Sequence, residues 1–159
     1  MRKVPGVALA AATGLAAAAL WPAAPAAARA PIGVQDDRLT SGPVEQVPER
    51  LRLLSASRAK VTRVDVLWSL VAPRRPARPA SPADPAYDFT RLDAVVRGLA
   101  ERGIVPIVVV YSAPPWAAGG RPIPEGTEVN PRAPSPPQFA AFMRALATRY
   151  SGRFRPRGE

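Results

Sequence analysis

The apolar positions after residue 30 fall into three successive strand-then-helix units. Strands are predicted at about 31–37, 61–67 and 104–111, and the third of these, IVPIVVVY, is an almost continuous β-branched run. Such runs are typical of strands that are covered on both faces. Repeated strand–helix units predict a parallel sheet joined by right-handed crossovers.

The first two helices of these units are predicted from apolar spacing and from their end signals. The segment Pro48–Ala59 begins with a proline, which suits the first turn of a helix, and carries leucines at helical spacing. The next helix is expected to begin near Asp88 or Thr90. Thr90 and Asp93 have the spacing of a capping box, and Gly103 is placed to end the helix.

The third helix has the clearest start signal. Ser135 is predicted as its N-cap, Pro136 as its first residue, and Gln138 as the partner of Ser135 in a capping box. Gly152 is placed to end it. Apolar residues recur at helical spacing along the second and third helices, and we interpret both stripes as core.

The loops distinguish between two architectures. Those after the second and third strands are long and rich in proline, whereas the turns from each helix to the next strand are short. This asymmetry is typical of a (β/α)8 barrel, which carries its functional site at the carboxyl ends of its strands. We therefore predict an α/β fold in which residues 31–159 form the first three βα units of a TIM (β/α)8 barrel. An open doubly wound sheet is the alternative, although no glycine-rich nucleotide-binding motif is present.

Residues 1–30 are predicted to be a signal peptide rather than part of the fold. Arg2 and Lys3 precede an apolar run of about 15 residues, and small residues then lead to the site Ala28-Arg29-Ala30. An apolar run of this length is short for a membrane span of roughly 20 residues. We therefore expect cleavage after Ala30 and secretion of the mature chain, with an uncleaved anchor as the alternative and no stable membrane span.

The composition removes several kinds of chemistry. The chain has no cysteine and no histidine, which excludes disulfides, zinc-finger spacings, Ser-His-Asp triads and Cys-His pairs. We expect no metal and no cofactor. The formal charge is +10, from 22 basic and 12 acidic residues, but the arginines are scattered and no basic run is interleaved with aromatics. Nucleic acid is therefore not the expected partner.

The second strand supplies two candidate site residues. Val64 and Val66 would face the helices. Arg63 and Asp65 would then share the other face and point into the barrel, near the end where barrel sites lie. They are either a structural ion pair or part of a functional site, because a buried charge needs a strong partner.

Two tryptophans lie at corresponding places in successive units. Trp68 and Trp116 each follow the end of a strand. An exposed aromatic ring beside a strand-end cleft can stack on the apolar C–H face of a sugar. Plain loop packing is the alternative for either residue alone, and their shared placement favours a functional role.

Several segments in order resemble one family. They are RVDVLWSLVAP, then YDFTRLDAVVRGLAERGIVPIVVVYSAPPWA, then a Ser-Pro-Pro-Gln-Phe helix that ends in ALATRYSGRF. Over about residues 31–155 the chain is similar to the front part of secreted bacterial retaining (β/α)8 glycoside hydrolases, in particular the β-xylosidase-like and cellulase-like families. The resemblance implies hydrolysis of O-glycosyl bonds in a carbohydrate substrate.

The resemblance also implies roles for individual residues. Arg63 would support a nucleophilic carboxylate, and Trp68 and Trp116 would line sugar subsites. Asp65 and Tyr111 are weaker matches as substrate-binding residues. Two acids that follow the first strand, Asp36 and Asp37, are weaker matches as well.

The catalytic carboxylates of this family have no counterpart in the chain. The resemblance places the acid/base in an Asn-Glu-Pro motif ending strand four and the nucleophile at the end of strand seven. The chain contains no Asn-Glu-Pro; Glu125 and Glu128 lie in a loop, and Glu159 is the last residue. Retention requires two carboxyl groups about 5–5.5 Å apart, so we assign no catalytic residue and expect no activity from this chain alone.

Two other functions stay open. One is a non-catalytic secreted carbohydrate-binding module, and the other is a basic envelope or nucleic-acid-binding protein. Our interpretation is an incomplete N-terminal portion of a hydrolase domain. With three of eight units, the first and third strands would be bare edges, which predicts marginal stability and self-association.

Overall fold

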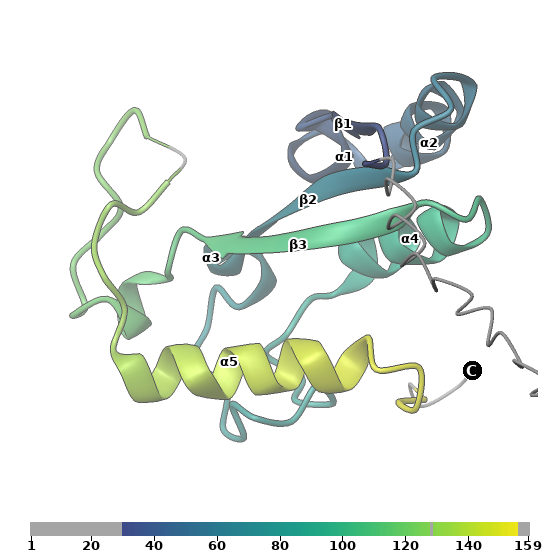
Figure 1. Ribbon diagram of the computed structural model, residues 1–159. Coiled ribbons are helices and arrows are strands. Elements are labelled where there is room, and N and C mark those ends of the chain that lie inside the picture. The colour runs from purple at the N-terminus through teal and green to yellow at the C-terminus, as the bar shows by residue number, and fades with distance from the viewer. Residues whose placement is uncertain (1–29, 128, 156–159) are drawn as a thin grey trace, which may run out of the picture.

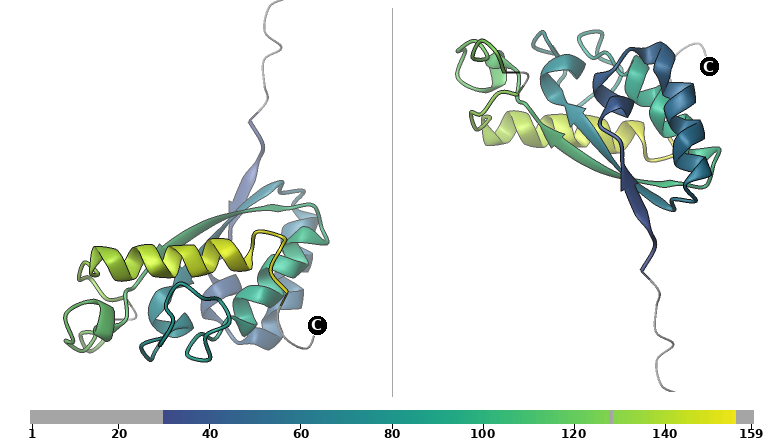
Figure 2. Two further views of the ribbon diagram at one scale, coloured as in Figure 1. Left: turned by 90° about the horizontal axis from the view of Figure 1, so that it is seen from below. Right: turned by 90° about the horizontal axis from the view of Figure 1, so that it is seen from above.

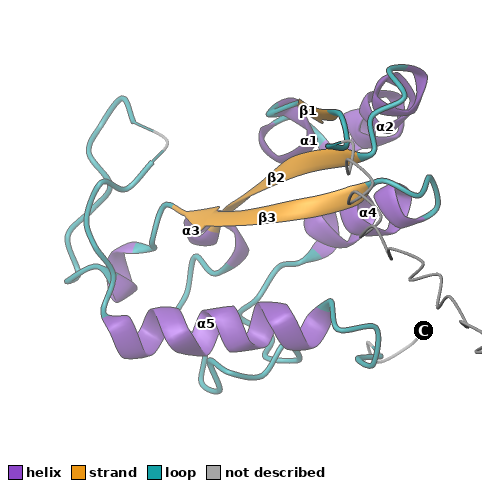
Figure 3. Ribbon diagram, viewed as in Figure 1, coloured by secondary structure: helices purple, strands orange, loops and turns teal. Residues whose placement is uncertain are grey.

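The computed structural model describes residues 30–127 and 129–155. The predicted signal peptide, residues 1–30, lies outside the described residues except for Ala30. The fold is mixed α/β, with a parallel three-stranded sheet in the order β1-β2-β3 (Figures 1 and 3). The strands are β1 (Gly33–Gln35), β2 (Val61–Leu67) and β3 (Val105–Tyr111). The prediction of a parallel sheet is confirmed.

Five α-helices and two 3-10 turns complete the described part of the chain. The α-helices are α1 (Arg38–Ser41), α2 (Val47–Ala56), α3 (Trp68–Val71), α4 (Thr90–Ala100) and α5 (Pro136–Arg149), and the 3-10 turns are η1 (Val44–Gln46) and η2 (Pro115–Ala117). The long helices α2, α4 and α5 are those that apolar spacing predicts. The short α1, α3, η1 and η2 were not predicted, because single turns carry no measurable period.

The helices gather on one side of the sheet (Figure 2). Val64 and Val66 of β2 are buried in the core on that side, as predicted. Arg63 shares the opposite face with Val105 and Ile107 of β3, which are 60% and 55% exposed. The expectation that β3 is covered on both faces is therefore wrong, because no described element lies over this second face. We call it the open face.

The strand ends of β2 and β3 lie side by side. Leu67 pairs in register with Tyr111, so the loops after both strands start at one edge of the sheet. Ser69 N–H donates to the carbonyl of Ser112 at 2.8 Å, which ties the two loops together just beyond that edge. Loops joined in this way form the surface on which parallel α/β folds carry their sites.

The predicted capping box of α4 is not formed. Phe89 occupies the N-cap, and the N–H of Thr90 is satisfied by Asp88 Oδ1 at 3.0 Å. This hydrogen bond holds the pKa of Asp88 below its ordinary value. Asp93 instead accepts hydrogen bonds from Arg149, the last residue of α5, and from Tyr150, its C-cap, because a guanidinium is a stronger partner than a backbone N–H.

The predicted start position of α5 is correct, but the predicted capping-box hydrogen bonds are not formed. Ser135 is the N-cap and Pro136 is the first helical residue. The side chain of Ser135 makes no capping hydrogen bond, and Gln138 Oε1 is buried without a partner among the described residues. No helix within residues 30–127 and 129–155 has the length and apolarity that crossing a membrane requires.

Candidate functional site

Arg63 and Asp65 form the ion pair that their spacing allows. Arg63 Nε donates to Asp65 Oδ1 at 2.6 Å on the open face. The Asp65 side chain is 9% exposed, whereas that of Arg63 is 45% exposed. The arginine therefore covers the carboxylate and keeps part of its guanidinium in contact with solvent. The charge-assisted hydrogen bond fixes the orientation of both side chains.

Trp68 lies in the core rather than at an exposed rim. Its side chain is 1% exposed, and its ring stacks on Phe142 of α5 with centroids 4.8 Å apart and planes at 7°. Phe139 of the same helix packs against it at 6.0 Å. The expectation of an exposed ring at this position is wrong, because the apolar stripe of α5 crosses the end of β2 and encloses the indole.

Trp116 packs against Trp68 in an edge-to-face arrangement. Their centroids are 5.5 Å apart, and Trp116 Nε1 donates to the carbonyl of Ala72 at 2.8 Å. Trp68 Nε1 is buried and has no hydrogen-bond partner within the described part of the chain. The structure thus brings the two tryptophans together as a packed pair that joins two loops.

A cavity of about 360 Å³ lies at the carboxyl end of β3. We call it the β3 cavity. It joins two of the predicted site residues, Trp68 and Tyr111, to residues that sequence reasoning did not select. Its wall includes the side chains of Trp68, Tyr111, Ser112, Asn130, Arg132 and Phe139.

Ser112 is held in a strained conformation at the edge of this cavity. It is buried and has a φ of 55°, in the left-handed region that residues other than glycine rarely adopt. Its hydroxyl lies 3.0 Å from that of Ser69 and accepts the N–H of Asn130 at 3.1 Å. Strain of this kind persists only where the surroundings fix it, and it is concentrated at functional sites.

Asn130 closes the far wall of the β3 cavity. Its Nδ2 donates to the carbonyl of Ala113 at 2.7 Å, and its Oδ1 accepts the N–H of Arg132 at 3.1 Å. The side chain therefore fixes the long loop after β3 to the strand end. Sequence reasoning missed Ser69, Ser112 and Asn130; serines after two successive strands were the available signal, whereas Asn130 is eighteen positions beyond Ser112 and carries none.

Of the other acidic residues considered from the sequence, those that the structure describes lie outside the β3 cavity, and Asp36 also forms an ion pair with Arg50 at 3.8 Å. Asp36 accepts the N–H of Arg38 at 3.1 Å, and Asp37 accepts Gln35 Nε2 at 2.6 Å. Glu125 is exposed in the loop after β3. Glu159 and the side chain of Glu128 lie outside what the structure describes. Among the described residues, no group of acidic, histidine or cysteine side chains could hold a metal ion.

The loop after β2 is organised by a buried carboxylate. Asp84 accepts the N–H groups of Arg78 at 2.8 Å and Ala86 at 3.0 Å. Burial acts to raise the pKa of Asp84, but these backbone donors hold the pKa below its ordinary value. The Asp84 carboxylate therefore stabilises the loop, and its lowered pKa makes it a poor general acid.

No protein-family model and no curated protein matches this chain. The fold and the geometry of its strand ends are consequently the basis on which a function is proposed.

Proposed function

We propose that this chain supplies the first three βα units of a retaining (β/α)8 glycoside hydrolase and that the β3 cavity contacts carbohydrate. The observation that carries the proposal is the composition of that cavity. The half-buried rings of Tyr111 and Phe139, backed by the buried ring of Trp68, meet hydroxyl, amide and guanidinium groups at the carboxyl end of a parallel strand. Sugars present the same combination of apolar C–H faces and hydroxyl groups.

The open face supports the barrel part of the proposal. Val105 and Ile107 are large apolar side chains that face solvent beside the Arg63–Asp65 pair. In a closed barrel this face is the interior, where such side chains are covered by the remaining strands. Arg63 would there stand beside the nucleophile, whose charge its guanidinium would stabilise.

The chain itself is not expected to perform the hydrolysis. Retention requires two carboxyl groups about 5–5.5 Å apart across the glycosidic bond. Asp65 is paired with Arg63, and Asp84 is bound by backbone N–H groups, so both carboxylates are already engaged within the fold. The role proposed for these three units is to bind and orient the sugar, and the acid/base and nucleophile would come from later units.

Sugar binding by the purified chain tests the proposal. Xylotriose and cellotriose should bind weakly in calorimetric titration, and Tyr111→Ala should weaken binding by about tenfold, the equivalent of roughly 1.4 kcal/mol. Thr127→Ala is the matched control, because Thr127 is exposed on the same long loop and its hydroxyl donates to the nearby carbonyl of Pro124. Absence of sugar binding, or an equal loss in both variants, would overturn the proposal.

A chromogenic glycoside assay tests the absence of catalysis. The purified chain should release no 4-nitrophenol from xylosides or glucosides. Turnover that disappears in Glu125→Gln or Glu128→Gln would show that the chain carries its own catalytic carboxylate. The coding DNA beyond codon 159 provides a second test, since the resemblance implies an Asn-Glu-Pro stretch at the end of strand four, which the length of a barrel unit would place within about forty codons.

A further inference from the structure

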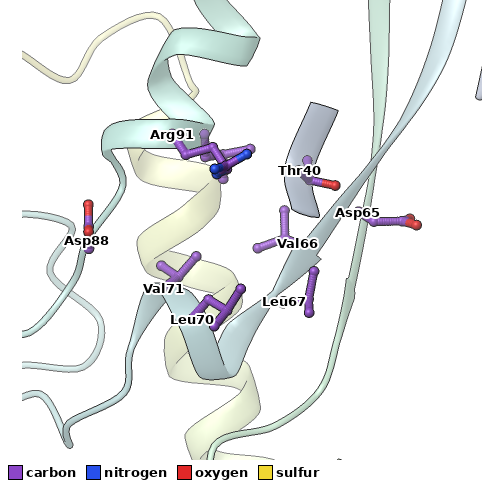
Figure 4. Close-up of a pocket in the computed structure, with 9 residues that line it drawn as sticks. Thr40, Asp65, Val66, Leu67, Leu70, Val71, Asp88 and Arg91 are labelled. Atoms are coloured by element: carbon purple, nitrogen blue, oxygen red, sulfur yellow. The ribbon is translucent and has the colours of Figure 1, made fainter. Parts of the chain in front are cut away.

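A second cavity, of about 120 Å³, lies between the end of β2 and the start of α4 (Figure 4). We call it the α4 cavity. Its walls are mostly aliphatic and come from β2, α3 and α4: Val66, Leu67, Leu70, Val71 and Leu92. It lies on the helix side of the sheet, is lined by none of the residues named for the β3 cavity, and does not depend on the carbohydrate proposal.

Arg91 is the cation of the α4 cavity. Figure 4 shows its guanidinium directed from α4 toward Thr40 and Val66. Arg91 as a whole is half-buried, but its Nη1 is shielded from solvent and has no hydrogen-bond partner among the residues that the structure describes. Within residues 30–127 and 129–155 no carboxylate pairs with it. A guanidinium nitrogen enclosed among aliphatic side chains is strongly unfavourable unless an anion or another acceptor reaches it.

Neither nearby carboxylate supplies that acceptor. Asp88 lines the cavity, but it is exposed and accepts the N–H of Thr90. Asp65 points to the other side of β2 from Val66 and pairs with Arg63 (Figure 4). The hydroxyl of Thr40 donates to the carbonyl of Asp37 at 3.3 Å, and its oxygen makes no hydrogen bond with Arg91 Nη1.

We propose that the α4 cavity binds a short-chain aliphatic carboxylate. The two oxygens of a carboxylate match the parallel N–H groups of one guanidinium. The alkyl chain would pack against Leu70, Val71 and Leu92, where it would leave water. A phosphate group is disfavoured, because it carries more charge and more acceptors than Arg91 alone can satisfy.

Titration of the methyl-labelled chain by NMR tests this assignment at constant ionic strength. Sodium propionate should give saturable shifts at the methyl groups of Leu70, Val71 and Leu92 and at Arg91 Nε–H. Propionamide has the same shape without the charge and should give at least tenfold weaker binding. No saturable shift, an equal response to propionamide, or an equal response to chloride or phosphate would overturn the proposal. This measurement requires no variant.

A charge-matched pair of variants identifies the binding group. Arg91→Gln should abolish the saturable propionate shifts. Arg144→Gln removes the same charge from an exposed position of α5 and should leave them unchanged. Loss of the shifts in both variants would show that only net charge matters, and retention in Arg91→Gln would exclude Arg91 as the ligand. If Arg91→Gln does not fold, the comparison of propionate with propionamide on the unaltered chain decides whether the cavity binds a carboxylate.

Discussion

Arg63 and Asp65 join across 2.6 Å on the face of the sheet that no described helix covers. β-branched side chains of β3 lie next to this pair, and Ile107 is directly beside Arg63 in register. An exposed apolar surface beside a free strand edge is a site for association with another chain. The first prediction follows from this arrangement.

Ile107→Lys should reduce self-association of the chain. Ile107 is on the open face of β3, which is an edge strand of the sheet. A lysine there interrupts the apolar surface and repels a second copy. Sedimentation velocity should show concentration-dependent species for the unaltered chain and mainly monomer for the variant. Leu70→Lys, also at an exposed position, is the control and should associate like the unaltered chain. A monomeric unaltered chain with a sharp cooperative melt would contradict the prediction.

Asp93→Asn should lower the free energy of unfolding by about 2 kcal/mol, the range measured for hydrogen bonds to charged groups. Asp93 Oδ1 accepts Arg149 Nε at 2.7 Å and the Tyr150 hydroxyl at 2.9 Å, and these bonds tie α5 to α4. The pairing with Asp93 also raises the pKa of Arg149. Urea denaturation followed by circular dichroism measures the change.

The exposed Arg52–Glu49 pair within α2 is the matched control for that experiment. It has similar geometry, with Arg52 Nε 2.8 Å from Glu49 Oε2, but both side chains are exposed. Glu49→Gln should therefore leave the free energy of unfolding nearly unchanged, because exposed pairs are screened by solvent. Equal effects of the two substitutions would show that the Asp93 bonds do not hold α5 in place.

Gly98→Ala should destabilise the fold although alanine is the better helix former. A Cβ at position 98 would lie 2.2 Å from Leu51 Cδ1, where α4 meets α2. Overpacking costs about 1–3 kcal/mol, and the gain in helix propensity of about 1 kcal/mol offsets part of it. Combining the change with Leu51→Ala should remove the penalty, as a double-mutant cycle of unfolding free energies would measure. Additive effects would exclude direct contact as the cause.

Tyr87 should titrate near pH 12. Burial, assisted by the charge of Asp84, raises the pKa of Tyr87 to about 12, and its hydroxyl donates to the carbonyl of Pro79 at 2.5 Å. A tyrosine in the unfolded chain titrates near pH 10. The folded chain therefore holds the proton more tightly, and this contribution to stability is present below pH 10 and is lost as the pH rises to about 12.

Ultraviolet absorbance of the phenolate, compared with that of Tyr87→Phe, isolates the titration of Tyr87. The variant should also lose less stability between pH 10 and 12. Some loss should persist, because burial raises the pKa of Tyr150 as well. A Tyr87 signal centred near pH 10 would contradict the prediction and would mean that the loop after β2 opens before the tyrosine ionises.

The sequence alone determined the order of the elements and the direction of the strands. Two examples are the strand Val61–Leu67 and the start of α5 at Pro136. Both could be predicted because hydrophobic period and proline placement are local properties of the chain. The pairing of Arg63 with Asp65 is likewise local, since side chains two apart on a strand share a face.

Only the tertiary structure decided what surrounds these residues. Trp68 is buried because α5, more than sixty residues later in the chain, lays Phe142 against it. Asn130 reaches Ser112 through a long loop whose path no spacing rule predicts. In the sequence Arg91 is one of the scattered arginines, and the enclosure of its Nη1 follows from the packing of α3 against α4. Burial is set by contacts between distant segments, so a pattern of neighbouring residues cannot determine it.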